Sequence, residues 1–241
     1  MCEPPWIAAE IQWIVTDRRV PSCASAGDAG PRIMQRMNDL ASIEAKRCVA
    51  AGVTAIEKKT SAEIVVMMRP DSGSYRQADL LAGAIAAFAY LCVFLYAPEP
   101  FDFTYFPLEQ AAAFGIAAFA CSRLPVLRRL LTPQKVLARN ALVAAKATFV
   151  DRGISKTRSR TGVLVYLSRF ERETVVVLDV GLDPARLGEP LVRAREALQA
   201  AGRRGDLEAL VKALETLGAT LAELYPVEDG DTDELPNEVA A

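Results

Sequence analysis

LLAGAIAAFAYLCVFLY, at Leu80–Tyr96, is an uninterrupted apolar run near the middle of the chain. No Asp, Glu, Lys or Arg lies between Asp79 and Glu99, which leaves 19 uncharged residues. At about 1.5 Å per residue, a helix of that length matches the ~30 Å hydrocarbon core of a bilayer. Only a helix that pairs its own backbone groups is stable at that depth. The run therefore predicts a membrane span.

A second, weaker span is predicted at Gln110–Ser122, QAAAFGIAAFACS, whose uncharged core is 13 residues. It becomes long enough to cross a bilayer if it runs from Phe103 to Leu124, which places Glu109 in the interface. Aromatic rings favour the headgroup level, where this span would place Phe101, Phe103, Tyr105 and Phe106. Together the two segments predict a transmembrane hairpin over residues 77–131. The alternative is a buried helical pair within a soluble domain.

The charges around the hairpin predict its orientation. The connection Ala97–Glu109 carries three acids and no base. Four bases precede the first span: Lys58, Lys59, Arg69 and Arg76. From Gln110 to Val150 every charge is positive: Arg123, Arg128, Arg129, Lys135, Arg139 and Lys146. Because Lys and Arg stay on the cytoplasmic side, both termini are expected there. The sequence thus predicts a multi-pass protein of the cell (inner) membrane, with the lipid bilayer as a partner.

Composition excludes several classes of function. The 241 residues contain no histidine, which removes Ser–His–Asp catalysis and His-ligated zinc. A net charge of −2 gives no electrostatic case for nucleic acid as a partner. The five cysteines have no CxxC spacing, which favours free thiols in a reducing compartment. Acidic Glu3 and Glu10 interrupt the first residues, so no secretory signal is predicted.

Outside the hairpin, the pattern predicts a discontinuous α/β domain over residues 38–76 and 132–225. Residues 1–37, rich in Pro, Gly and Ser, are expected to be a disordered leader. Helical spacing of apolar residues predicts a helix at Asp39–Lys58, with Asn38 or Asp39 as its N-cap. The run EIVVMM at Glu63–Met68 predicts a buried central strand.

After the hairpin, Thr132 is expected to cap a helix that Pro133 opens and that ends near Val150. Strands follow at Gly162–Ser168 and Thr174–Val180, with a charged turn at Arg169–Glu173 between them. We expect these two strands to pair antiparallel, and the first two strands of the domain to pair in parallel across the inserted hairpin. Two further helices and an acidic tail complete the chain: Pro184–Ala201, Asp206–Tyr225 with a leucine stripe, and residues 226–241.

Three polar groups are candidates for chemistry. Asp179 follows the apolar run of the third strand, where it could act as a catalytic carboxylate or, with Asp183, hold a divalent cation. We expect its side chain to be partly solvated at the rim of the sheet; the alternative is that it caps the following turn or helix. The hydroxyl pair Thr60 and Ser61 suits either an anion or a helix end. A basic run suits phosphate, anionic lipid or a solvated loop near the membrane: Arg152, Lys156, Arg158 and Arg160.

Three stretches, KKTSAEIVVMM, FVDRGISKTRSRTGVLVYLSRFERETVVVLDVGLD and DELPNEV, resemble the TPM domain family, also called the TPM phosphatase family. The resemblance implies a compact α/β sandwich with helices on both sides of a small sheet. Some members are associated with phosphatase activity and others with assembly or maintenance of membrane complexes. The family's acidic sites would correspond to Asp179 and Glu63. Here the predicted spans interrupt the domain after its first strand, unlike the secreted members.

The sequence therefore predicts an α/β fold, with a small mixed sheet flanked by helices in a TPM-like sandwich and an inserted two-helix transmembrane hairpin. The leading functional hypothesis is a cytoplasm-facing interaction or scaffolding module that binds other membrane proteins and needs no cofactor. The alternative is a metal-assisted phosphatase, in which Asp179 and Glu63 are the candidate catalytic residues and Asp179 and Asp183 the candidate metal ligands.

Overall fold

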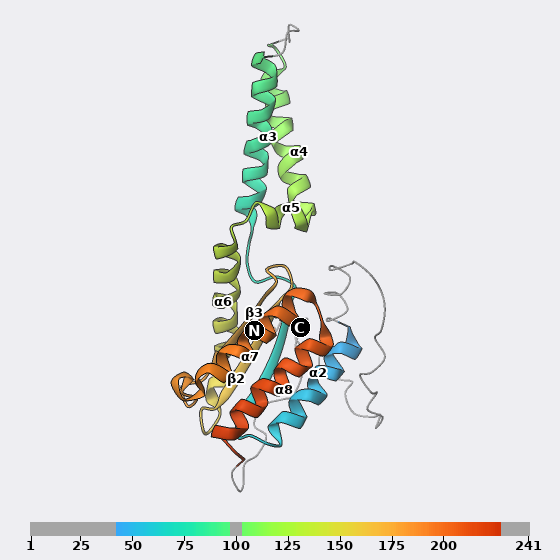
Figure 1. The fold of residues 1–241 in the computed structure, drawn as a ribbon. Coiled ribbons are helices and arrows are strands. Elements are labelled where there is room, and N and C mark those ends of the chain that lie inside the picture. The colour runs from blue at the N-terminus through green and yellow to red at the C-terminus, as the bar shows by residue number, and fades with distance from the viewer. Residues whose placement is uncertain (1–41, 97–102, 228–241) are drawn as a thin grey trace, which may run out of the picture. The chain divides into compact units, whose positions relative to one another are not determined.

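The computed structural model describes residues 42–96 and 103–227, so the predicted leader, the acidic tail beyond Val227 and part of the hairpin loop lie outside it. The elements of this part of the chain (Figure 1) are, in order, α2 (Ile43–Glu57), β1 (Glu63–Arg69), α3 (Arg76–Tyr96), α4 (Phe106–Arg123), α5 (Pro125–Leu130), α6 (Gln134–Asp151), the 3-10 turn η1 (Ile154–Lys156), β2 (Gly162–Ser168), β3 (Glu173–Leu178), α7 (Pro184–Arg204) and α8 (Leu207–Leu224).

The three strands form one mixed sheet in the order β1-β2-β3. β1 and β2 are parallel, with Glu63 opposite Gly162 and Arg69 opposite Ser168. β2 and β3 are antiparallel, from Val163 opposite Leu178 to Ser168 opposite Glu173. Both predicted pairings are confirmed, including the parallel pair that α3 to α6 separate in the sequence. The prediction of a central first strand is wrong, because β2 lies in the middle and is buried at every position.

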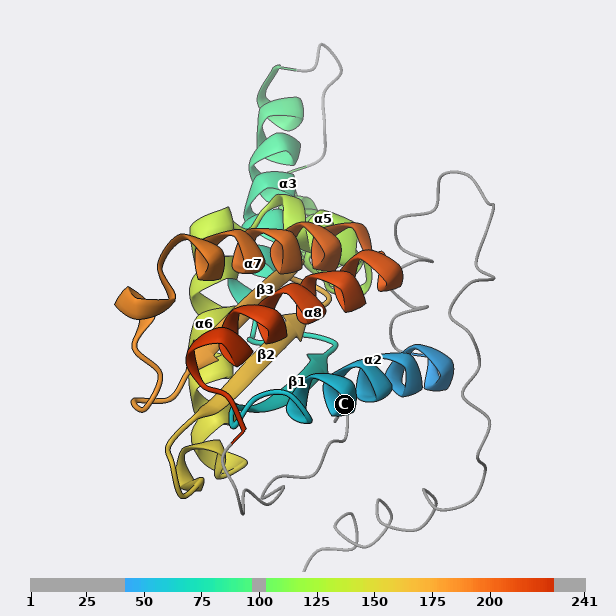
Figure 2. The same cartoon turned by 60° about the horizontal axis from the view of Figure 1, so that its bottom comes forward.

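Helices cover both faces of the sheet (Figure 2), which confirms the predicted mixed α/β fold with flanking helices. On one face α2, α7 and α8 bury the larger cluster, and the predicted leucine stripe of α8 lies in it: Leu210, Leu214, Leu217 and Leu221. α6 covers the other face, where Ala145 and Phe149 pack with Leu164 and Tyr166. At the α2–α8 contact a Cβ on Gly218 would lie 2.2 Å from Ile56 Cγ2, so only glycine allows this approach.

Two predicted helix starts are corrected. The Ser42 hydroxyl caps α2 by accepting a hydrogen bond from the Ala45 N–H at 3.1 Å, while Asn38 and Asp39 lie outside the described residues. At α6 the Thr132 hydroxyl donates to the Arg128 carbonyl at 2.7 Å and therefore does not cap the helix that follows. The third strand is also shorter than predicted, since β3 ends at Leu178 before the chain turns.

Candidate functional site

The surface that stands out in this fold is the apolar exterior of α3 and α4. α3 has 21 residues and a mean hydropathy of 2.1 over its most apolar 18-residue window, of which 17% is buried. It is the one helix of the described ranges that is long and apolar enough to cross a membrane. Large apolar side chains of the two helices and of the turn before α4 are exposed: Leu80, Leu81, Ile85, Phe88, Val93, Leu95, Phe103, Tyr105, Leu108, Ile116 and Phe119.

α4, the predicted second span, has 18 residues and does not meet the same test. Ala-rich composition lowers its hydropathy, and Glu109 and Arg123 fall within its bounds. The two helices nevertheless pack side by side and antiparallel (Figure 1), since Gln110 Nε2 donates to the Ala87 carbonyl at 3.0 Å and Cys121 Sγ donates to the Ala78 carbonyl at 3.7 Å. The hairpin geometry is therefore present, and the crossing of a bilayer by both helices stays a prediction.

A hydrogen-bonded network joins this hairpin to the sheet. Glu171, in the turn after β2, is fully buried at 0% exposure. Its Oε1 accepts from the Ser72 N–H at 2.7 Å and from the Tyr75 hydroxyl, and its Oε2 accepts from the Ser168 hydroxyl. The loop that leads from β1 into α3 is thus held by a carboxylate from the turn after β2.

The hydroxyl groups extend this network into the sheet. Ser72 Oγ donates to Ser168 Oγ at 2.7 Å and lies 3.0 Å from the Tyr166 hydroxyl. Burial, followed by the hydrogen bond to Glu171, raises the pKa of Tyr75, and burial raises the pKa of Tyr166. Both phenols therefore stay protonated at neutral pH, and the Tyr75 hydroxyl donates to Glu171. The Tyr75 ring also packs against Phe170, with ring centroids 4.6 Å apart.

The predicted charged turn is present at residues 169–172, and its acids are buried. Glu173, like Glu171, is buried, and its Oε1 accepts from Gln134 Nε2 at 2.6 Å and from Arg203 Nη2 at 3.1 Å. Gln199 Nε2 donates to Glu173 Oε2. Glu173 thus connects β3 to α6 and α7. Glu171 connects the turn to the loop at the base of the hairpin.

Asp179, the first candidate from the sequence, lies at the end of the sheet where β1 and β2 begin, opposite the end that carries Glu171. It is 5% exposed, so the expected partly solvated carboxylate is wrong. Its N–H donates to the Gly162 carbonyl at 2.9 Å, and its Oδ1 accepts from the Val180 N–H at 2.8 Å. Its Oδ2 is buried with no hydrogen-bond partner in the described part of the chain. Antiparallel pairing explains the placement, because β3 ends where β1 and β2 begin.

The other two candidate acids differ in their positions relative to Asp179. Glu63 is at the same edge, at the start of β1, with β2 between the two strands. Asp183 is exposed and caps α7, since its Oδ1 accepts from the Ala185 N–H at 2.9 Å. Within residues 42–96 and 103–227, no three His, Cys, Asp or Glu side chains are grouped to hold a metal ion. The carboxylates present there do not fit a divalent cation, which needs several oxygen ligands.

The other two polar groups singled out in the sequence are the hydroxyl pair at Thr60 and the basic run from Arg152 to Arg160. Thr60 Oγ1 donates to the Tyr225 carbonyl at 2.8 Å and accepts from the Ala62 N–H at 3.2 Å, so it ties the start of β1 to the end of α8. The basic run from Arg152 to Arg160 precedes β2, at the sheet edge opposite the hairpin. Its predicted position near the membrane flank is therefore wrong, because α6 carries the chain along the sheet to the far edge.

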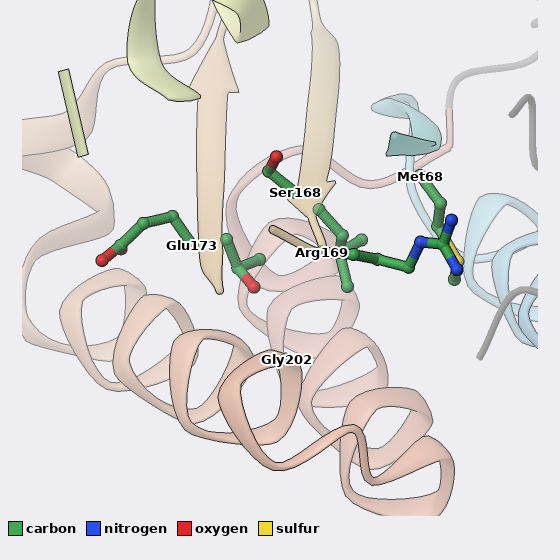
Figure 3. A pocket seen from close by; sticks show the side chains of 7 residues that line it. Met68, Ser168, Arg169, Glu173 and Gly202 are labelled. Carbon is green, nitrogen blue, oxygen red and sulfur yellow. The ribbon is translucent and has the colours of Figure 1, made fainter. Parts of the chain in front are cut away.

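A small pocket lies at the carboxyl edge of β2 (Figure 3), lined by Met68, Ser168, Arg169, Glu173 and Gly202 among others. Its volume of about 10 Å³ holds roughly one water molecule. It therefore does not fit a small-molecule substrate.

Sequence reasoning missed Ser72, Tyr75, Ser168 and Glu171. Their proximity could have been predicted, because Ser72 and Tyr75 follow β1 and Glu171 follows β2, and these two strands were predicted to be parallel. Parallel strands end at the same edge of a sheet, so the loops after them meet there.

The fold defines a small mixed α/β domain that carries a helical hairpin between its first two strands. No protein-family model matches the sequence, and no curated protein matches it. Among solved structures, the chain is similar to the NMR structure of the BA42 protein from the psychrophilic bacterium Bizionia argentinensis, with a TM-score of 0.50 and 18% sequence identity over 83% of this chain and 93% of that one. At that identity the likeness concerns the fold alone.

Replacing Asp179 by Asn tests whether this residue has a catalytic role. We expect the variant to fold and to change the free energy of unfolding by about 1 kcal/mol or less, since Asn keeps the side-chain oxygen that accepts from Val180. Chemical denaturation followed by circular dichroism measures this. Metal-dependent phosphate release by the unaltered chain that disappears in Asp179→Asn would contradict a purely structural role.

Proposed function

We propose that the chain is a membrane-anchored, cytoplasm-facing TPM-like α/β domain that serves as an interaction or scaffolding module for a membrane complex. The observation that carries the proposal is the exposed apolar surface of α3, a helix of 21 residues with 17% of its apolar window buried. A core helix of a soluble domain would bury that surface against its neighbours. Exposed apolar patches of this extent mark contact with lipid or with a partner protein.

The charges at the two ends of the hairpin support the orientation. α3 begins at Arg76 and α4 ends at Arg123, so both exposed bases lie at the end that joins the α/β domain. The other end carries Glu99, Asp102 and Glu109 in the sequence. Basic residues remain in the cytoplasm during insertion. This charge asymmetry supports the proposed cytoplasmic side for the α/β domain.

The arrangement of acids favours a binding role over catalysis. A hydrolase acting through Asp179 needs a second polar group beside it in an open cleft. Asp179 is instead buried at one edge of the sheet, with Asp183 engaged in capping α7. A rigid sheet with helices on both faces offers outer helix surfaces to partners.

Cysteine labelling in intact cells tests the anchoring and its orientation. In a chain whose five native cysteines are replaced by Ala, Asp102→Cys should react with a membrane-impermeant thiol reagent and Asp231→Cys should not. After the cells are opened, both positions should react, which controls for buried thiols. Reaction at position 231 but not at 102 in intact cells would overturn the proposed orientation.

Purification from mildly solubilised membranes tests the scaffolding role. We expect the full chain to co-purify with other membrane proteins and to release no phosphate from a generic aryl phosphate, with or without added divalent cation. A chain that purifies alone and hydrolyses the ester in a metal-dependent way would replace the scaffolding function by an enzymatic one.

A further inference from the structure

The short helix α5 is set apart from the hairpin by a sharp turn. α4 ends at Arg123, and Leu124 between the helices is extended, with φ −108° and ψ 96°. Pro125 then opens α5, where the missing N–H of proline is tolerated. The chain therefore leaves the direction of α4 just where the apolar hairpin ends.

Two adjacent arginines fix α5 to two different parts of the protein. Arg128 forms a two-bond pair with Asp79 in the first turn of α3, with Nε to Oδ1 at 2.9 Å and Nη2 to Oδ2 at 2.7 Å. Arg129 Nη1 donates to the Phe170 carbonyl at 2.8 Å, in the turn between β2 and β3. One base thus holds α5 to the hairpin and the next base holds it to the sheet. Both arginine side chains therefore point toward the rest of the protein and do not cover the outer face of α5.

That outer face is apolar and exposed. Leu124 is 54%, Val126 is 63% and Leu130 is 80% exposed. Val126 and Leu130 are four positions apart, so they lie on the same side of the helix. Burial of such side chains away from water is favourable, and no residue of the described ranges covers them at this face.

The surroundings indicate what covers this face. α5 follows the end of α4 directly, and exposed Arg76 and Arg123 lie at the same end of the hairpin. Bases at that level attract anionic lipid headgroups. A short amphipathic segment there lies in the interface plane, with its apolar side chains among the first acyl carbons.

We propose that α5 is an in-plane interfacial helix whose Leu124, Val126 and Leu130 insert into the cytoplasmic surface of an anionic bilayer. This inference rests on the proposed membrane anchoring by α3 and goes beyond it. It assigns to α5 the contact that sets the position of the α/β domain on the membrane, because Arg129 connects the helix to the turn that contains Glu171.

Depth-dependent fluorescence quenching tests the proposal. Single tryptophans are placed at Val126, Leu130, Ile85 or Val180 of the full chain, in a background in which Trp6 and Trp13 are replaced by Phe. Each variant is reconstituted in phosphatidylcholine–phosphatidylglycerol vesicles whose acyl chains are brominated at a shallow or a deep carbon. Ile85 is an exposed position of α3, and Val180 is an exposed apolar position at the far edge of the sheet, which makes it the matched control.

We expect Val126→Trp and Leu130→Trp to lose most of their fluorescence with the shallow label. Ile85→Trp should be quenched most by the deep label, and Val180→Trp by neither. Quenching at Ile85 without quenching at Val126 and Leu130 would overturn the role of α5 and leave the membrane anchoring intact. No quenching at Ile85 would overturn the anchoring itself. Tryptophans on α5 that are shielded from aqueous acrylamide but not quenched by lipid would show that a protein covers the helix, which also overturns the proposal.

Discussion

Deleting residues 77–128 and joining Arg76 to Arg129 through a short Gly/Ser linker should move the chain from the membrane fraction to the soluble fraction with its sheet intact. The deletion removes the exposed apolar surface of α3 and α4. Asp79 and Arg128 are in contact at 2.7 Å, so the two ends are close in space. Loop-closure entropy rises only with the logarithm of loop length, so a shorter connection is not penalised.

The measurements are fractionation and circular dichroism. The full chain should remain in the pellet after alkaline carbonate, whereas the shortened chain should stay in the supernatant and unfold cooperatively. Leu214→Ala in the shortened chain is a matched control, since Leu214 is fully buried in the sheet core and its truncation should cost about 2–5 kcal/mol. A shortened chain that is unfolded at every linker length would show that the hairpin belongs to the core of the domain.

Glu171→Ala should lower the free energy of unfolding by roughly 3–5 kcal/mol, because it leaves several buried donors without their acceptor. These donors are the Ser72 N–H and the hydroxyls of Tyr75 and Ser168. Glu171→Gln should cost less, since the amide keeps the size of the side chain and one acceptor oxygen. Urea denaturation of the shortened chain, and of the full chain in detergent, measures the difference.

Tyr75→Phe is the matched control for Glu171. It removes one donor to the carboxylate but keeps the ring that packs on Phe170 at 4.6 Å. We expect a loss of about 1 kcal/mol, in line with a single hydrogen bond. If Glu171→Ala is no more destabilising than Tyr75→Phe, the network does not hold the hairpin to the sheet.

The sequence allowed β2 to be predicted to the residue, because an apolar run bounded by Gly162 and a polar turn has few other interpretations. The parallel partner of β2 was also correct, although β1 was placed in the centre of the sheet. Strand order depends on which strands find partners, and the apolar run of β1 is typical both of a central strand and of an edge strand under a helix. Local patterns therefore predicted pairs of strands better than their order.

The buried network at Glu171 could not be predicted from its own neighbourhood. The residues RFER, at Arg169–Arg172, look like a solvated turn because charged side chains are rarely buried without partners. The partners of Glu171 come from Ser72 and Tyr75, far away in the sequence. Asp179 was chosen as a candidate because it follows an apolar strand, a position where ligands often bind. Since β3 is antiparallel to β2, Asp179 lies instead at the end of the sheet where β1 and β2 begin.

Parallel pairing of β1 and β2 also sets an order of events on the ribosome. Glu63 is synthesised well before Gly162, its partner in the register, and α3 to α6 emerge between them. At a translation rate of about 5–20 residues per second, this delay is on the order of 5–20 s. During that time β1 has no strand to pair with, so the sheet of this domain can close only after the whole hairpin has left the ribosome.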